Sequence, residues 1–290
     1  MTLHGKTCLV TGATSGIGEA TALALAARGA AVAILCRDAQ RGEQTCERIR
    51  AAVPGASLRV FRADLGSQAE IRAIAREILD ALPELHVLVN NAAALYVSRT
   101  ETVDGIEATF AVNHLGYFLL TNLLLPRLRE SAPARIVNVA SDAHKFVGGI
   151  HFEDPGYEKG YGAMRVYGHS KLANILFTRE LARRLEGSGV TVNCLHPGAV
   201  ATGLGGNNGA WARLVMKIVG LFFRSPEQGA QTSIYLASSP EVEGVTGGYF
   251  VRCKETEPAA SGRDDDAARR LWAVSEEMTG LAPSSAAAGS

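Results

Sequence analysis

The sequence has few cysteines, no excess of either charge, and none of the short motifs that mark metalloenzymes or serine hydrolases. Its five cysteines are scattered, and no two stand in a Cys-x-x-Cys spacing. A disulfide framework and a cysteine-rich zinc site are therefore not indicated. Several cysteines fall in apolar runs, so we expect them to be buried apolar side chains in a reducing compartment.

The charge balance also excludes a class of partner. There are 29 basic and 29 acidic residues among 290, whereas domains that bind nucleic acid usually carry a basic surface. The chain has no Gly-x-Ser-x-Gly nucleophile motif, and its seven histidines form no His-Glu-x-x-His or other ligand-spaced group. We therefore expect no nucleic-acid partner and no metal site.

The two ends of the chain lack targeting features. Residues 1–6 lead directly into an apolar run, so we expect neither a signal peptide nor a membrane anchor, and a cytoplasmic location. Residues 282–290 are small and polar and are expected to be disordered. No linker or internal repeat divides the rest, so residues 1–281 are predicted to form a single domain.

Short apolar runs alternate with helix-like segments along most of this domain. Their nearly continuous apolar character is typical of a parallel sheet covered on both faces, which predicts a doubly wound α/β (Rossmann-type) fold. The expected strands are Thr7–Thr11, Ala31–Cys36, Ser57–Arg62, Val87–Asn90, Arg135–Ala140, Thr191–Leu195 and Gly248–Val251. A closing helix is expected from Asp264 to Gly280, where three successive acids favour the helix dipole more than they indicate a metal site.

A glycine-rich turn follows the first expected strand. Gly12, Gly16 and Gly18 separate that strand from an alanine- and leucine-rich segment, residues 19–29, that ends at a glycine. Strand, glycine turn and helix N-terminus together form a site where backbone can approach a dinucleotide pyrophosphate closely.

A second motif lies far downstream, at Tyr167 and Lys171. On a helix, residues i and i+4 project from one face, so these two side chains can act on the same ligand. His169 points about 200° around the helix from Tyr167 and is expected to be structural. A pair that can move a proton and a turn that can hold a cofactor together suggest an oxidoreductase.

These motifs resemble the short-chain dehydrogenase/reductase family over about residues 5 to 255. Further matches occur in the expected order: Asp64-Leu65, Asn90-Asn91-Ala92, Asn113, Ser141 and Pro197-Gly198. The resemblance implies a nicotinamide cofactor held by Gly12, Thr14, Ser15, Gly16, Ile17, Gly18, Arg37, Asp64, Leu65, Asn91, Ala92, Tyr167, Lys171, Pro197 and Gly198.

Two of these positions have particular expectations. By resemblance Asp64 accepts a hydrogen bond from the adenine amino group, although it could instead cap the helix that follows, and Asn90 to Ala92 line the adenine ribose. Ala93 stands where the family usually has glycine. If that position needs a positive φ, the methyl group costs about 1 kcal/mol.

The choice of cofactor depends on the end of the second strand. The acid that selects NAD in this family is replaced by Cys36, and Arg37 follows it. A guanidinium facing a 2′-phosphate makes charge-assisted hydrogen bonds, so NADP(H) is favoured. NAD(H) stays possible because Asp38 lies 20 residues after Gly18, close to the spacing of a ribose-binding acid.

The resemblance also implies catalytic roles. Tyr167 is the general acid or base, and we expect the ammonium of Lys171 to lower its pKa. Ser141 hydrogen-bonds the reacting oxygen, and Asn113 positions a water linked to Lys171. Taken singly, Ser141 could be a helix cap, Asn113 a surface residue and Lys171 a solvated charge.

Two stretches could determine the substrate. The 26-residue spacing from Ser141 to Tyr167 is longer than usual in the family, and the extra residues would lie beside the mouth of the site. A segment of about residues 199–226 combines a glycine-rich part with apolar side chains. It could be a mobile lid, a permanently packed helix or subunit interface, or a membrane contact.

Several runs resemble the retinol dehydrogenase-like branch of the family more closely: Val112–Gly116, Ser170–Phe177 and Gly229–Ser233. The function indicated is NADP(H)-dependent interconversion of a carbonyl and an alcohol on a small apolar substrate, retinoid-like, long-chain or aromatic. The alternatives are a catalytically silent NADP(H)-binding sensor or scaffold and, within enzymes, reduction of a carbon–carbon double bond. Homo-oligomers are common in the family and remain possible here.

Overall fold

Eight strands form one sheet in the computed structural model, which describes residues 2–198 and 225–282. The sheet order is β3-β2-β1-β4-β5-β6-β7-β8, and all neighbours pair in parallel except β7 with β8. The strands are β1 (Thr7–Thr11), β2 (Ala31–Cys36), β3 (Leu58–Arg62), β4 (Val87–Asn90), β5 (Ala134–Val139), β6 (Val190–His196), β7 (Tyr249–Val251) and β8 (Lys254–Thr256).

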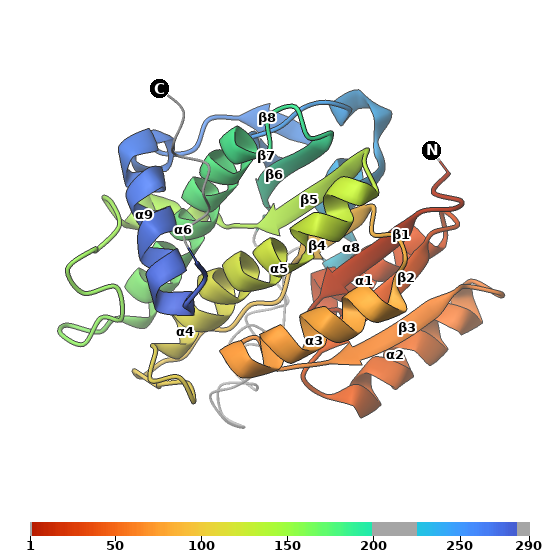
Figure 1. The fold of residues 1–290 in the computed structure, drawn as a ribbon, viewed down its shortest axis with the longest axis horizontal. Helices are drawn as coiled ribbons and strands as arrows, with labels where there is room; N and C mark the ends of the chain where they lie inside the picture. The colour runs from red at the N-terminus through yellow and green to blue at the C-terminus, as the bar shows by residue number, and fades with distance from the viewer. Residues whose placement is uncertain (1, 199–224, 283–290) are drawn as a thin grey trace.

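Helices cover both faces of this sheet (Figure 1). One face carries α3 (Gln68–Ala81), α5 (Gly116–Glu130) and α6 (Ala163–Arg184), with α9 (Asp265–Thr279) packed on α6. The other face carries α1 (Gly16–Ala26), α2 (Ala39–Ala52) and α8 (Pro226–Ser238). Short elements complete the described part: α4 (Ala108–Phe110), the π-helix η1 (Ala111–Leu115) and the 3-10 helices η2 (Asp142–Phe146), η5 (Pro240–Val242) and η6 (Ala260–Arg263).

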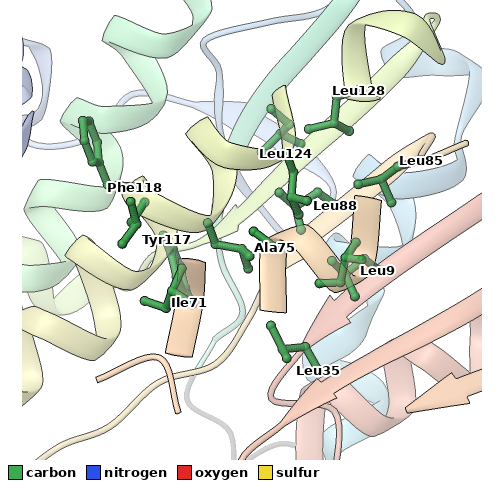
Figure 2. Packing of buried hydrophobic residues seen from close by; sticks show 14 of the residues in the cluster. Leu9, Leu35, Ile71, Ala75, Leu85, Leu88, Tyr117, Phe118, Leu124 and Leu128 are labelled. Atoms are coloured by element: carbon green, nitrogen blue, oxygen red, sulfur yellow. The ribbon is translucent and has the colours of Figure 1, made fainter. Parts of the chain in front are cut away.

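Each strand contributes side chains to both layers of the core, because successive side chains point to opposite faces of the sheet. Leu9 packs with α3 and α5, as Figure 2 shows, whereas Cys8 and Val10 pack with α1 and α8. This double burial explains the nearly continuous apolar runs of the sequence. The predicted doubly wound α/β fold is confirmed.

The hairpin at the end of the sheet was not predicted. β8 is a short, exposed strand and carries no apolar pattern. Its connection to β7 uses Arg252 and Cys253 at φ values of 53° and 60°, a left-handed turn built without glycine. The signals used to find strands and turns are therefore both missing there.

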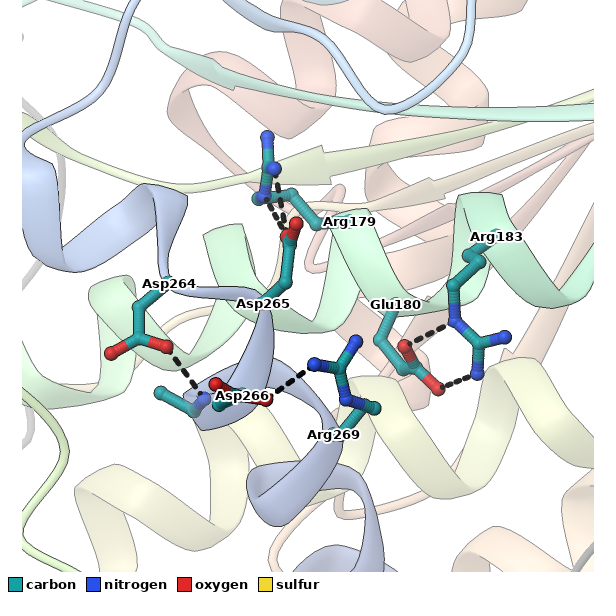
Figure 3. Close-up of polar contacts among 8 residues, drawn as sticks. Arg179, Glu180, Arg183, Asp264, Asp265, Asp266 and Arg269 are labelled. Carbon is teal, nitrogen blue, oxygen red and sulfur yellow. Dashed lines mark hydrogen bonds and ion pairs between the residues drawn. The ribbon is translucent and has the colours of Figure 1, made fainter. Parts of the chain in front are cut away.

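Two predictions about side chains can be compared with the structure. Four cysteines are buried and Cys253 is partly exposed; all five are free thiols. The acids before and at the start of α9 are used separately, as Figure 3 shows: Asp264 accepts from Ala267 N–H, Asp265 pairs with Arg179 and Asp266 with Arg269. The first caps the helix, and the others form ion pairs with neighbouring arginines.

One helical stretch among the described residues, Ala108–Glu130, is long and apolar enough to cross a membrane by length and composition. In the fold 78% of its apolar window is buried, so packing against α3 and α6 accounts for its composition. Residues 199–224 of the expected lid segment, and 283–290 of the expected tail, lie outside the described residues.

Candidate active site

The predicted site residues converge at the carboxyl ends of the parallel strands. The order of the sheet reverses between β1 and β4, which lie side by side. From β1 the following strands, β2 and β3, lie toward one edge of the sheet, and from β4 the following strands lie toward the other edge. Such a switch point is where doubly wound sheets bind their ligands. Gly12 follows β1 there, Asn91 follows β4, Ser141 follows β5 and Pro197 follows β6.

The glycine turn is packed too closely for any larger residue. Gly12 has a φ of 65°, and a Cβ on it would lie 2.6 Å from the Cα of Ala92. A Cβ on Gly18 would lie 2.4 Å from the amide nitrogen of Asn91. That amide donates to the carbonyls of Thr11, at 2.9 Å, and Gly12, at 3.2 Å. The turn and the end of β4 therefore form one rigid wall.

This wall fits a pyrophosphate. The N-terminus of α1 points out of the turn, and the side chain of its N-cap, Ser15, makes no capping hydrogen bond. The backbone N–H groups of the first turn thus have no side-chain acceptor at Ser15, and the helix dipole adds positive potential. Ile17 is buried beneath the turn, whereas Thr14 and Ser15 remain accessible.

Thr11 was not predicted to belong to the site, yet it organises the end of β4. Its hydroxyl accepts from the backbone N–H groups of Asn91 and Ala92, at 2.9 and 3.0 Å. The buried Tyr117 donates to the carbonyl of Ala92 at 2.7 Å. A threonine at the last position of the strand before the turn is the only sequence signal for this role.

Asn90 was expected to line the ribose, and this is wrong. Its side chain is fully buried and donates to Thr121 and to Asn138, each at 2.9 Å. Asn90 is the last residue of β4, and its side chain is directed at Thr121 of α5 and Asn138 of β5, inside the core.

The expected cost of Ala93 does not arise. Within the described ranges the non-glycine residues with positive φ are Tyr157, Arg252 and Cys253, so Ala93 has an ordinary backbone conformation. The methyl group is exposed and needs no glycine. The turn after β4 accepts alanine without backbone strain.

Asp64 follows β3, where the adenine contact was predicted. Its carboxylate accepts from the backbone N–H of Gly66 at 2.8 Å, and the N-cap of α3 is Ser67. The alternative that Asp64 caps this helix is therefore wrong, and its carboxylate stays partly accessible. Leu65 is buried against the start of α5.

Asp38 and Arg37, the two residues that bear on the choice of cofactor, lie just after the end of β2 and have different surroundings. Asp38 accepts from the backbone N–H of Arg41 at 3.1 Å and caps α2. Arg37 is exposed, and Cys36 is buried with its thiol donating to the Asp38 carbonyl at 3.2 Å. Asp38 is thus used as a helix cap, and Arg37 is an exposed residue beside it.

Tyr167 and Lys171 lie on α6, one turn apart as predicted. Lys171 is only 1% exposed, and its Nζ donates to the Val139 carbonyl at 2.9 Å. The same Nζ lies 5.6 Å from the ring centroid of Tyr167 and 5.8 Å from that of Tyr117. Lys171 is therefore not a solvated charge.

Burial changes both ionisable groups. It lowers the pKa of Lys171 to about 7 and raises that of Tyr167 to about 12, with a hydrogen bond between Tyr167 and Ser141 acting in the opposite direction. Desolvation disfavours the phenolate and the ammonium alike. That Lys171 lowers the pKa of Tyr167 therefore stays a prediction, which requires the ammonium form of Lys171.

Asn113 is fully buried within η1, so the alternative of a surface residue is wrong. Its amide oxygen accepts from Ala94 N–H at 2.7 Å, and its amide nitrogen donates to the Ala94 carbonyl and to Ser170 Oγ. Ser170 in turn donates to the Tyr167 carbonyl at 2.8 Å. Asn113 thus ties the loop after β4 to the helix of Tyr167, and its role toward a water remains a prediction.

His169 has a structural position, as its direction on the helix predicts. It is fully buried, its Nε2 accepts from His151 N–H at 3.1 Å, and its ring stacks on Phe110 at 5.2 Å. Burial lowers its pKa to about 4, so it stays neutral at physiological pH.

The long connection from Ser141 to Tyr167 begins with η2 and then runs as a loop to the start of α6. It encloses a pocket of about 400 Å³ whose lining includes Phe146, Ile150, Tyr157 and Arg165. Phe146 is 71% exposed. The exposed ring of Phe146 therefore gives this pocket an apolar part of its lining.

Comparison with known proteins agrees with this arrangement. The sequence pattern of the family described as short chain dehydrogenase matches residues 6–213. Retinol dehydrogenase 14 of Mus musculus is 50% identical over 292 residues, which cover 96% of this chain and 87% of the mouse protein. Retinol dehydrogenase 11 of Homo sapiens is 46% identical over 279 residues, which cover 96% and 87%.

Solved structures give the same result. A crystal structure of an uncharacterised protein from Mycobacterium paratuberculosis matches with a TM-score of 0.76 and 34% identity, covering 96% of this chain and 95% of that one. The RhlG/NADP active-site complex of Pseudomonas aeruginosa matches with a TM-score of 0.67 and 31% identity, covering 86% and 95%. The chain is thus a retinol dehydrogenase-like member of the short-chain dehydrogenase family, an oxidoreductase of alcohol and carbonyl groups.

Proposed function

We propose that this protein interconverts a carbonyl and an alcohol on an apolar substrate with NADP(H), and that Tyr167 is its general acid and base. The observation that carries the proposal is the buried Lys171, held beside the ring of Tyr167 while Ser141 hydrogen-bonds the phenol. Within residues 2–198 and 225–282 no acidic side chain pairs with Lys171, and burying a lysine in this way costs free energy, which a purely structural role would not require.

The proposed mechanism assigns one task to each group. In reduction the phenol of Tyr167 gives its proton to the carbonyl oxygen, and in oxidation the phenolate removes it from the alcohol. The Ser141 hydroxyl donates to the same oxygen and stabilises the charge that develops there. Lys171, when protonated, stabilises the phenolate. The nicotinamide, when bound, supplies or accepts the hydride.

NADP(H) is the proposed cofactor because Arg37 is accessible at the end of β2 while Asp38 is used as a helix cap. Arg37→Ala should lower kcat/KM with NADPH by about 10- to 100-fold, as expected for loss of charge-assisted bonds worth about 1.5–3 kcal/mol. It should leave kcat/KM with NADH nearly unchanged. Equal losses with both cofactors would contradict the assignment of Arg37.

The apolar substrate class is supported by the names of the relatives, which are retinol dehydrogenases, and by the exposed Phe146 of the loop between Ser141 and Tyr167. The test is NADPH consumption at 340 nm with retinaldehyde, long-chain and aromatic aldehydes and ketones, with NADH in parallel. Turnover confined to polar carbonyls would contradict the substrate class.

The alternative of a silent NADP(H)-binding sensor or scaffold predicts a different result in the same assay. A sensor would bind NADPH, measured by fluorescence titration, and consume none with any carbonyl of the panel. A cytoplasmic location and homo-oligomer formation remain predictions that this assay does not address.

A further inference from the structure

His144 lies three residues after Ser141, in η2, and is fully buried. Both nitrogens of its ring have partners. Nδ1 lies 2.7 Å from the carbonyl oxygen of Ser141, and Nε2 lies 3.1 Å from the backbone N–H of Ala259. The edge of the ring meets Tyr249, with centroids 5.4 Å apart.

These contacts determine where the proton of the imidazole lies. The N–H of Ala259 can only donate, so Nε2 must be the acceptor and carry no proton. A neutral imidazole then carries its proton on Nδ1, which donates to the Ser141 carbonyl. Burial lowers the pKa of His144 and favours this neutral form.

The hydrogen bond from His144 Nδ1 restrains the carbonyl of Ser141, the residue whose hydroxyl we propose to contact the reacting oxygen. The ladder between β5 and β6 ends just before this residue, with Ala140 N–H donating to the Leu195 carbonyl at 2.8 Å. The carbonyl of Ser141 accepts instead from His144, through the ring and also through the backbone N–H at 3.2 Å. Holding this carbonyl limits rotation about ψ of Ser141, and so helps fix the direction of η2 relative to its Cβ.

The other side of the ring is held by a distant part of the chain. Ala259 precedes η6, which packs on α6 so closely that a Cβ on Gly262 would lie 3.3 Å from Ile175. The N–H of Ala259 thus selects the tautomer of His144 from a segment that rests on the helix of Tyr167 and Lys171.

From this geometry we propose that His144 is a positioning residue for the reaction: the Ala259 N–H sets its tautomer, and its Nδ1–H orients the carbonyl of Ser141. The proposal rests on the proposed function, because it acts through the Ser141 hydroxyl. It adds the C-terminal segment to the parts of the chain on which the reaction depends.

Two substitutions separate the two bonds. His144→Asn places its amide nitrogen near the position of Nδ1 and retains the bond to Ser141. His144→Gln reaches the position of Nε2 and retains only the bond to Ala259. With equal NADPH affinity, kcat should fall about 10- to 100-fold in His144→Gln and in His144→Ala, as for other positioning groups, and His144→Asn should retain most of it.

Retention of kcat in all three variants, an equal loss in all three, or rescue by Gln rather than Asn would each overturn the proposal. Melting temperatures measured beside the kinetics separate unfolding from mispositioning. Tyr167→Phe is run in the same series: if wild-type turnover does not depend on Tyr167, the proposed function fails, whatever His144 does.

A measurement independent of activity tests the contact itself. Two-bond proton–nitrogen NMR spectra distinguish protonated from unprotonated imidazole nitrogens, and the His144→Asn spectrum assigns the signals of His144. The expected result is a protonated Nδ1 and an unprotonated Nε2. The opposite tautomer, or a doubly protonated ring at neutral pH, would overturn the inference.

Discussion

Lys171 combines full burial with one hydrogen-bond partner among the described residues, the Val139 carbonyl, and this makes its protonation sensitive to folding. Its pKa falls from 10.5 to about 7 on burial. Between these values the unfolded chain binds a proton that the folded chain does not. The free energy of unfolding therefore rises with pH across this window, by up to about 1.4 kcal/mol per pH unit, and below pH 7 the cost of burial is fully present.

Replacing Lys171 by methionine should remove this dependence. We expect Lys171→Met to be more stable than the wild type near pH 6.5, and this advantage should shrink steadily towards pH 10. Urea unfolding of both proteins at several pH values measures the difference, in which the other titrating groups cancel. A difference that does not change with pH would show that Lys171 keeps its ordinary pKa.

At the level of single residues, the sequence predicted the position of the site correctly, but it did not predict the orientation of every side chain in it. Tyr167 and Lys171 lie together as their spacing predicted, and Ser141 lies beside Tyr167 as the family resemblance implied. The prediction that Asn90 lines the ribose was wrong because Asn90 still belongs to β4, where the geometry of the strand decides the direction of the side chain. The backbone conformation of Ala93 could not be read from a motif either, because it depends on how the loop leaves the sheet.

Among the elements, the glycine turn between β1 and α1 leaves no room for a side chain at Gly18. Gly18→Ala would place a methyl group 2.4 Å from both Asn91 Nδ2 and the Gly12 carbonyl oxygen. We expect the turn and the end of β4 to separate, with NADPH affinity falling at least tenfold and stability by about 1–3 kcal/mol.

Gly148→Ala is the matched control, because a Cβ there meets no atom within 4 Å. It should leave both quantities unchanged. Fluorescence titration with NADPH and urea unfolding measure them. Equal effects of the two substitutions, or none from Gly18→Ala, would show that the close packing of the turn does not matter.

The contact of α9 with the helical layer depends on Trp272. This side chain is 4% exposed, meets Phe118 and Phe177 with centroid distances of 4.9 and 5.9 Å, and lies under the guanidinium of Arg184. Trp272→Ala should lower the free energy of unfolding by about 3–5 kcal/mol. Trp272→Phe, which keeps an aromatic ring, should lose much less. Similar losses in the two variants would argue against packing as the cause.

Elements with a strong apolar pattern were predictable, and weak ones were not. The seven predicted strands all exist, because burial on both faces leaves a clear run of apolar residues. β8 was missed because its three residues are exposed and, in the described part of the chain, it pairs only with β7. The π-helix η1, which holds Asn113, has no pattern of its own and depends on the packing of its neighbours.

In the whole molecule, strand order brings together residues that are distant in the chain. Gly12, Asn91, Ser141 and Pro197 meet because β1, β4, β5 and β6 are parallel neighbours. The predicted parallel sheet implies this convergence, so the location of the site could be expected from sequence. The network around Ser141 could not, because it joins the ring of His144 to the backbone groups of Ser141 and Ala259, and backbone groups leave no signal in the sequence. The single sheet supports the proposal that residues 1–281 form one domain.

The most direct test of the central claim is a single-turnover reduction of retinaldehyde with saturating NADPH by the wild type and by Tyr167→Phe. The substitution removes one hydroxyl and keeps the ring beside Lys171. We predict that both proteins bind NADPH equally and that the rate of NADPH oxidation falls about 100- to 10,000-fold in the variant. Equal rates in the two proteins would contradict the assignment of Tyr167 as the proton donor.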